Sequence, residues 1–377
     1  MIKTKGVAAF VLIVSLTISA GDARAFNGDF ARSDVFVSGQ EGYHTFRIPS
    51  VIVTKEGTVL AFCEGRKTGG GDHGDLDLVL KRSHDSGKTW GSLELVYEEG
   101  GEAKVTIGNP CPVVDQATGT IWLPFCRNND DVLMTHSTDD GQTWSKPTDI
   151  TADVKPTSWG WYATGPGVGI QLTQGAHQGR MVIPCDHREK AGGHDAMYSH
   201  VFYSDDSGRT WNLGGTLDKH TDECQVIELA DGRLMLNMRN YWGRAGKVAE
   251  KGGMRAVSYS SDGGSTWSAL EFHKALIEPI CQASYLRYTS PADEGENYVL
   301  FSNPASTSKR HQLTVRLSED EGRTWPTAAV LHEGPAAYSC LTVLPDKTIG
   351  CLYEGGKKSA YETIIFARFS LDWLSAE

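Results

Sequence analysis

The stretch Ser83-His84-Asp85-Ser86-Gly87-Lys88-Thr89-Trp90 is the first of five copies of one pattern, Ser-x-Asp-x-Gly-x-Thr-Trp, in a chain of 377 residues. The copies begin at Ser83, Ser137, Ser204, Ser260 and Ser318, at spacings of 54, 67, 56 and 58 residues. Each spacing accommodates one four-stranded sheet with its connections. The period therefore predicts a β-propeller or a related array.

Each shared position of this repeat, the Asp-box, has a structural explanation. The aspartate can accept hydrogen bonds from backbone N–H groups across a tight turn, and the glycine tolerates positive φ. The tryptophan can bury a large apolar surface between neighbouring sheets. The five aspartates are Asp85, Asp139, Asp206, Asp262 and Asp320. We interpret the repeats as structural elements rather than catalytic ones.

A second period runs in step with the first. Each Asp-box is preceded by two apolar runs that flank a turn rich in Gly or Asp. These hairpins occupy 48–63, 111–126, 168–185, 225–238 and 280–302, and a sixth, 340–353, follows the last Asp-box. We therefore predict an all-β, six-bladed β-propeller with five Asp-box turns, whose last blade also contains the strand 362–369. The extended segment Asp34–Ser38 is expected to close the ring as the missing outer strand.

Composition and the N-terminal segment limit the partners and the cellular location that the protein can have. The chain has 42 glycines, which suits an all-β fold, and a formal charge of −11, which disfavours a nucleic-acid partner. Lys3 and Lys5 precede the apolar run Val7–Ile18, and Ala23-Arg24-Ala25 offers a small-x-small cleavage site. We expect residues 1–25 to be a signal peptide and residues 26–377 to form a propeller catalytic domain. An uncleaved anchor is the weaker alternative, because the run is short for a bilayer.

This interpretation places the protein in the periplasm, at the cell surface or outside the cell, as a monomer without stable membrane insertion.

The positions of the eight cysteines follow the strand period and show no spacing of their own. They end second strands (Cys63, Cys126, Cys185, Cys351) or begin first strands (Cys111, Cys224, Cys281, Cys340). Buried thiols are favoured over the alternative of several disulfides. The sequence has no CxxC pair and no HExxH cluster, so we predict no metal and no cofactor.

Strand direction predicts which residues share one face. If first strands run down and second strands return, the starts of first strands and the ends of second strands meet at the top, opposite the Asp-box turns. The polar residues there are Arg47, Arg66, Asp72, Arg127, Asp130, Asp186, His187, Arg188, Glu223, Arg239, Arg310 and Tyr338. Arg47, Arg239 and Arg310 come from different blades, and converging guanidinium groups suggest a bound anion, most simply a carboxylate. The alternative is that each arginine pairs with a surface acid.

The motif Phe46-Arg47-Ile48-Pro49, followed by five Asp-boxes, resembles the bacterial and animal exo-α-sialidases, glycoside hydrolases that remove terminal sialic acid. The resemblance covers essentially the whole mature chain. It implies that Arg47, Arg239 in Asn237-Met238-Arg239-Asn240, and Arg310 after Phe301-Ser302-Asn303-Pro304 grip the sialic acid carboxylate. Lys309 and Arg316 are nearby alternatives to Arg310. Arg66 resembles a further substrate-contacting arginine.

The resemblance also implies the catalytic residues. Tyr338 is similar to the family's nucleophile, Glu223 to the base that takes its proton, and Asp72 to the acid/base, with Asp75 and Asp77 as rivals. A neutral phenol suits this chemistry, because an anionic nucleophile would be repelled by the carboxylate on the anomeric carbon. Asp72 would protonate the leaving oxygen and later deprotonate the water that releases the product with retained configuration.

The implied function is hydrolysis of sialylated glycans, glycoproteins or glycolipids by an exo-α-sialidase. Trans-sialidases, intramolecular or intermolecular, and Kdn-preferring hydrolases remain alternatives within the class. A non-catalytic sialic acid lectin would have lost Tyr338, Glu223 or Asp72, which this chain keeps. The loop Ser158–Tyr162 is expected at the top, where its aromatic residues could stack on sugars or pack over a blade junction. Arg127 and Asp130 have suitable positions but no motif.

Overall fold

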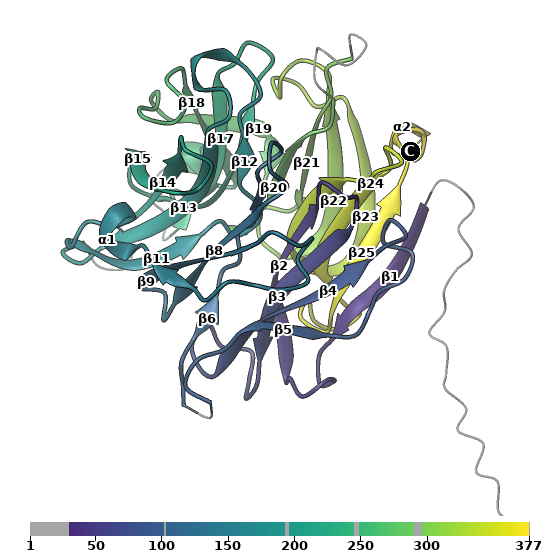
Figure 1. The fold of residues 1–377 in the computed structure, drawn as a ribbon. Coiled ribbons are helices and arrows are strands. Elements are labelled where there is room, and N and C mark those ends of the chain that lie inside the picture. Colours follow the sequence, from purple (N-terminus) through teal and green to yellow (C-terminus); the bar gives the residue numbers. More distant parts are fainter. Residues whose placement is uncertain (1–29, 102, 193–195, 245–248, 290–295, 377) are drawn as a thin grey trace, which may run out of the picture.

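The computed structural model describes residues 30–101, 103–192, 196–244, 249–289 and 296–376. The predicted signal segment 1–25 lies outside them. Strands dominate the fold and form sheets arranged around a central axis (Figure 1). Among these residues the helical elements are the short helices α1 (Thr151–Val154) and α2 (Leu371–Ala376) and the 3₁₀ turns η1 (Gly175–His177) and η4 (Ala249–Lys251). The chain is an all-β, propeller-like protein.

Four of the sheets are formed from consecutive strands. The first contains β2 (Thr45–Val53), β3 (Val59–Arg66), β4 (Leu76–Ser83) and β5 (Glu94–Tyr97). The second contains β6 (Ile107–Gly108), β7 (Val113–Val114), β8 (Ile121–Arg127), β9 (Asp131–Ser137) and β10 (Thr148–Asp149). The third contains β11 (Trp159–Thr164), β12 (Ile170–Gln171), β13 (Met181–Glu189), β14 (Met197–Ser204) and β15 (Asn212–Thr216). The fourth contains β16 (Thr221–Glu228), β17 (Leu234–Asn240), β18 (Met254–Ser260) and β19 (Glu271–Ile277).

The remaining sheet has seven strands because one strand serves two sets of neighbours. It contains β20 (Ser284–Arg287), β21 (Val299–Pro304), β22 (His311–Ser318), β23 (Thr327–Val343), β24 (Ile349–Gly355), β25 (Thr363–Phe369) and β1 (Phe30–Val37). β23 has 17 residues; its first half pairs with β22 as far as Pro335, and its second half pairs with β24 from Ala336 onward. The sequence predicted two separate hairpins here, and the continuous β23 joins them.

The ring closes between the N-terminal and C-terminal segments. β1 pairs antiparallel with β25, from Phe30 opposite Phe369 to Val37 opposite Thr363. The predicted closing role of the segment Asp34–Ser38 is thereby confirmed, although the strand begins four residues earlier, at Phe30. Successive sheets also meet: β6 contacts β3, β11 contacts β8, β16 contacts β13, β20 contacts β16, and β2 contacts β23 and β24. Every sheet thus touches its neighbours around the axis.

The five repeats form the same turn, which directly follows β4, β9, β14, β18 and β22 in turn. In every copy the serine hydroxyl donates to the aspartate and accepts from the glycine N–H, while the threonine N–H and hydroxyl both donate to the aspartate. The predicted structural role of these aspartates is confirmed. The turn glycines have positive φ, for example 78° at Gly87.

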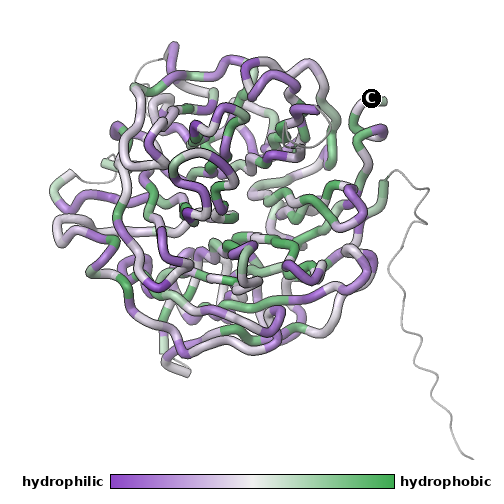
Figure 2. The backbone as a smooth tube through the Cα atoms, turned by 45° about the horizontal axis from the view of Figure 1, so that its top comes forward, coloured by the Kyte–Doolittle hydropathy of each residue, from purple (hydrophilic) through white to green (hydrophobic). Residues whose placement is uncertain are grey.

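The repeat tryptophans lie where neighbouring sheets meet. The ring of Trp90 packs 5.2 Å from Phe366 of β25, and that of Trp144 packs 5.8 Å from Phe62 of β3. Trp211 packs 6.0 Å from Trp122 of β8. Hydrophobic stretches of the chain gather in the interior, and hydrophilic ones are frequent at the periphery (Figure 2). Burial between sheets is what these large side chains contribute to stability.

The cysteines confirm the prediction of buried thiols. All eight are buried and unpaired. Burial raises the pKa of the Cys111 thiol well above its ordinary value, and that of Cys281 to about 11. The thiols therefore stay protonated and act as small apolar groups in the core.

Two of the predicted first strands are interrupted. β6 and β7 both pair with β8, and β11 and β12 both pair with β13. The prediction of a loop at Ser158–Tyr162 was wrong, because β11 begins at Trp159. The aromatic packing explains the strand: Trp159 is buried and stacks on His187 of β13, with ring centroids 3.3 Å apart. No helix among the described residues is long and apolar enough to cross a membrane.

Candidate active site

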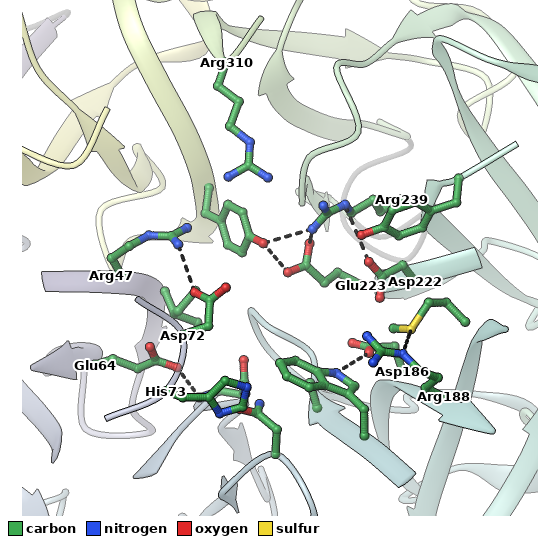
Figure 3. A pocket seen from close by; sticks show the side chains of 18 of the residues that line it. Arg47, Glu64, Asp72, His73, Asp186, Arg188, Asp222, Glu223, Arg239 and Arg310 are labelled. Atoms are coloured by element: carbon green, nitrogen blue, oxygen red, sulfur yellow. Dashed lines mark hydrogen bonds and ion pairs between the residues drawn. The ribbon is translucent and has the colours of Figure 1, made fainter. Parts of the chain in front are cut away.

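A cavity of about 390 Å³ lies at one end of the ring, where strands from different sheets converge. Its wall contains all seven residues predicted to form the site: Arg47, Arg66, Asp72, Glu223, Arg239, Arg310 and Tyr338. Figure 3 shows the charged side chains of this wall pointing toward one another from separate elements. The expectation that first-strand starts and second-strand ends share one face is confirmed for these residues.

Tyr338, in the second half of β23, contacts a carboxylate and a guanidinium group at the same time. Its hydroxyl donates to Oε1 of Glu223, and Nη1 of Arg239 donates to Glu223 Oε2 at 2.7 Å and to the phenolic oxygen at 3.1 Å. Burial and the Glu223 charge raise the pKa of Tyr338 well above its ordinary value, against the opposing effect of the arginines. The resting phenol is therefore neutral, with its proton directed at a carboxylate.

Arg47 is held rigidly by a carboxylate that sequence reasoning missed. Glu354, fully buried on β24, accepts from Arg47 Nε at 2.9 Å and from Nη2 at 3.3 Å, and also accepts the N–H of Ile48 at 2.9 Å. The guanidinium carbon of Arg47 lies 5.0 Å from the centroid of the Tyr338 ring. A two-pronged contact of this kind fixes the plane of the guanidinium group.

Arg310 approaches the same tyrosine with only neutral partners. It donates to the hydroxyl of Tyr361 at 2.9 Å and to the carbonyl of Ile280 at 3.4 Å, and its guanidinium carbon lies 5.4 Å from the Tyr338 ring centroid. Within the described parts of the chain, no carboxylate forms an ion pair with Arg310. A partly buried cation without a counter-ion is suited to an anionic ligand.

Asp72 sits at the edge of the cavity, with 64 % of its side-chain surface exposed. It accepts from Arg66 Nη1 at 2.9 Å and from Arg47 Nη1 at 3.5 Å. Burial acts to raise the pKa of Asp72, but Arg66 and Arg47 outweigh it, and the pKa is lowered. Arg66 is itself fixed by Glu64, at 2.6 and 3.0 Å, so the resting Asp72 is an ionised and oriented group.

The rival residues lie elsewhere. Asp75 and Asp77 are not among the residues that line the cavity, and both pair with Lys67 Nζ, at 3.1 and 3.2 Å. Arg316 is outside the lining as well and donates to Asn303 Oδ1 at 3.1 Å. Lys309 is also outside the lining. Position in the cavity therefore favours Asp72 over the two other aspartates and Arg310 over the two other cations.

Three residues of the predicted top face do not reach the cavity. Arg127 pairs with Asp131 at 2.7 Å, Asp130 pairs with Lys155, and His187 packs beneath Trp159. The prediction that they face a common pocket was wrong. Local partners within their own part of the ring satisfy the first two, and aromatic packing buries the third.

Glu64, Asp222 and Glu354 were missed as polar members of the site or its support, whereas Asp186 was predicted on this face but was given no role. A signal was present for Glu64, because it directly follows a cysteine that ends a second strand, as Asp186 does. Glu354 closes the second strand of the sixth hairpin, and Asp222 precedes Glu223. Glu64 bonds Arg66 on its own strand, whereas Glu354 bonds Arg47, and Asp186 meets Asp222, from different strands far apart in sequence. No single strand reveals the last two contacts.

Comparison with known proteins identifies the class first: the model of the BNR repeat-like domain matches residues 57–352. The chain is 36% identical over 369 residues to a sialidase of Micromonospora viridifaciens, covering 92% of this chain and 54% of that protein. It is 34% identical over 379 residues to an exo-alpha-sialidase of Aspergillus fumigatus, covering 88% and 86%. The chain belongs to the sialidase family.

A solved structure supports the same assignment. The Hadza microbial sialidase Hz136 superposes with a TM-score of 0.80 at 30% sequence identity, over 91% of this chain and 69% of that one. This chain spans about half the length of the Micromonospora relative. The likeness therefore covers the propeller-like part that carries the cavity.

Proposed function

We propose that this chain is an exo-α-sialidase, which hydrolyses terminal α-linked sialic acids of glycans, glycoproteins or glycolipids with retention of configuration. The observation that carries the proposal is the joint contact of Tyr338 with Glu223 and Arg239, within a wall that also contains Arg47 and Arg310. The cavity wall thus combines a phenol, a base for its proton and three guanidinium groups. This combination is suited to binding and attacking a sugar that carries a carboxylate on its anomeric carbon.

Substrate recognition would begin with the sugar carboxylate. Arg47, Arg239 and Arg310 surround the Tyr338 ring, and Arg310 has no carboxylate partner among the described residues. A carboxylate placed between these groups receives several charge-assisted hydrogen bonds. It would also place the adjacent anomeric carbon above the phenolic oxygen of Tyr338.

The covalent step needs a proton to leave Tyr338. Because the pKa of this phenol is raised by burial and by Glu223, phenolate does not form in the resting site. The proton passes to Glu223 along the existing hydrogen bond as the oxygen bonds to the anomeric carbon and the glycosidic bond breaks. The arginines stabilise the phenolate character that develops in this step. A tyrosyl-sialosyl intermediate results.

Asp72 would serve the leaving group. It is ionised in the empty site because Arg66 and Arg47 lower its pKa. A substrate carboxylate bound to Arg47 removes part of that positive potential, and the pKa of Asp72 rises toward the working range of a general acid. Asp72 then protonates the departing oxygen and later takes a proton from the attacking water.

We further propose that the ring is a propeller of six blades. The two halves of β23 pair with different neighbours. The first half forms a four-stranded set with β20, β21 and β22, and the second half forms another with β24, β25 and β1. Added to the four consecutive sheets, these two sets complete the six-bladed arrangement expected from the six hairpins.

Proton NMR of the protein with a sialyllactose tests the proposal. The expected result is free sialic acid that appears first as the α anomer. The β anomer as first product contradicts retention, and an anhydro sugar or transfer to added lactose indicates a trans-sialidase. Binding without cleavage indicates a lectin. A parallel run with a Kdn glycoside reports the preference at the sugar's fifth carbon.

A further inference from the structure

Two buried carboxyl groups of the cavity have no part in the chemistry above. Asp186 lies near the end of β13 and is 1% exposed, and Asp222 lies near the start of β16 and is 4% exposed. Both line the cavity beside Glu223, and their carboxyl groups lie within hydrogen-bonding reach of each other. Two ionised carboxylates so placed would repel one another, because both side chains are largely buried from water.

The hydrogen-bond partners of Asp186 indicate where a proton is needed. Oδ2 accepts the indole N–H of Trp161, from β11, at 3.2 Å. Oδ1 is buried and has no donor among the described residues. An ionised Asp222 offers only acceptors, so the two groups can bond only if one of them carries a proton.

The charged surroundings differ for the two members. Oδ2 of Asp222 lies 3.6 Å from Nε of Arg239, and the hydroxyl of Tyr241 also faces Asp222. Figure 3 shows Arg239 between the carboxyl groups of Glu223 and Asp222. Asp222 is therefore the member stabilised as an anion, and Asp186 is the member suited to hold the proton.

No other described group supplies Asp186 with a close positive charge. His187, next to it on β13, is neutral near pH 7, because burial lowers its pKa to about 3. Arg188 donates to the sulfur of Met197 at 3.3 Å, and among the described residues it forms no ion pair with Asp186. From β16, both Asp222 and Glu223 face Asp186 with negative charge, and only the more distant Arg239 opposes them.

We propose that Asp186 and Asp222 share one proton and act as a positioning pair for Arg239. The charged Asp222 holds the Nε side of the guanidinium group, so that Nη1 stays on Glu223 and Tyr338. The neutral Asp186 keeps a second negative charge away from Glu223. The inference rests on the proposed function only for its effect on turnover; the shared proton itself does not depend on it.

Burial, followed by the charges of Asp222 and Glu223, raises the pKa of Asp186 well above its ordinary value, which agrees with this assignment. As pH rises through that pKa, the proton leaves and a second negative charge appears beside Glu223. Asp222 then loses its donor, and the carboxylates compete for Arg239. The pair therefore predicts an alkaline loss of turnover that originates outside the reacting groups.

Infrared difference spectroscopy tests the proton directly. The wild-type protein minus Asp186→Asn at neutral pH should show the carbonyl stretching band of a protonated carboxyl group. In wild-type protein this band should disappear on alkaline titration, a readout that does not depend on whether the variant folds. Identical spectra for the two proteins, together with no titrating band in the wild type, would overturn the proposal. Neither measurement requires turnover, so it can fail independently of the proposed function.

Kinetics with an aryl sialoside test the positioning role. Asp222→Asn removes the anion that faces Arg239, whereas the amide of Asp186→Asn can still donate to Asp222. We expect Asp222→Asn to lose on the order of 10-fold more kcat/KM than Asp186→Asn, mainly through KM. Asp186→Asn should also move the alkaline limb upward by about one pH unit or more.

Asp130→Asn is the matched control, since Asp130 pairs with Lys155 outside the cavity lining. It should leave the pH profile unchanged. Equal losses in Asp186→Asn and Asp222→Asn, or an alkaline limb of Asp186→Asn that coincides with the wild type, would contradict the positioning pair.

Discussion

Carboxylates occupy two contrasting regions of this molecule, the repeat turns and the cavity. In a repeat turn every donor is local: Asp139 accepts from Ser137 Oγ at 2.8 Å and from the N–H and hydroxyl of Thr143 at 2.9 and 2.6 Å. In the cavity Glu223 accepts from Tyr338, which is 115 residues away. The carboxylates of the repeat turns therefore hold local structure, whereas Glu223 joins parts of the ring that are far apart in sequence.

Asp139 in a repeat turn and Asp186 in the cavity wall also differ in the direction of their pKa shifts. Hydrogen bonds from the Thr143 side chain and backbone, and from Ser137, lower the pKa of Asp139 to about 2. Burial and neighbouring negative charge raise the pKa of Asp186. The pKa of an aspartate is thus lowered where its turn supplies hydrogen-bond donors, and raised where burial and neighbouring negative charges act on it.

The most severe test of the comparison is Tyr338→Phe. It removes the oxygen that contacts Glu223 and Arg239 and leaves the ring in place. We expect turnover to fall by on the order of 10³-fold or more, while binding of 2-deoxy-2,3-didehydro-N-acetylneuraminic acid persists. Steady-state rates and calorimetry provide the two readouts. Near wild-type cleavage of an aryl sialoside by this variant would exclude Tyr338 as the nucleophile.

Asp72→Ala should discriminate between leaving groups. We expect roughly 10²- to 10⁴-fold loss on sialyllactose and much less on an aryl sialoside, whose leaving oxygen scarcely needs a proton. For wild-type protein, activity on sialyllactose should fall as pH rises, because the acid form of Asp72 becomes scarce and its pKa is lowered in the empty site. Asp75→Ala is the control, and a leaving-group dependence there instead would reassign the acid.

The arginine wall should give an intermediate effect. Replacement of Arg47, Arg239 or Arg310 by Lys keeps the charge but loses the planar fork, at a cost of about 1.5–3 kcal/mol in binding of the same inhibitor. The inhibition constant should rise roughly 10- to 150-fold. Arg316→Lys, outside the cavity lining, should leave affinity nearly unchanged. Unchanged affinity in the first three variants would contradict the carboxylate clamp.

The smallest effect is expected in the repeat turns. Asp139→Asn weakens three local hydrogen bonds and should lower the free energy of unfolding by about 1 kcal/mol without changing kcat/KM. Because the folded pKa is about 2 and the unfolded value is about 3.9, the wild-type contribution is complete above the unfolded value and is lost as pH falls through 2. Urea unfolding from pH 5 downward should show a shallower acid dependence in the variant. A catalytic defect at neutral pH would contradict a purely structural turn.

The sequence alone determined the features that repeat or follow locally from strand geometry. The period of the repeats predicted the sheets, their turns and the positions of the tryptophans between sheets, because each turn is completed within eight residues. Alternating strand direction then predicted that Arg47, Glu223 and Tyr338 share one face. That rule does not say how far a side chain extends toward the axis of the ring. It therefore also included Arg127 and Asp130, which local partners hold outside the cavity.

Only the tertiary structure decided which of these groups meet. Glu354 reaches Arg47 across 307 residues of sequence, and Asp186 meets Asp222 from a neighbouring sheet. It also separated Asp72 from Asp75, three residues apart, by placing one in the cavity and the other on Lys67. Such contacts depend on the accumulated twist and closure of the whole ring. A strand's own residues set its faces and turns, but the distance between two strands is fixed only when every sheet between them is packed.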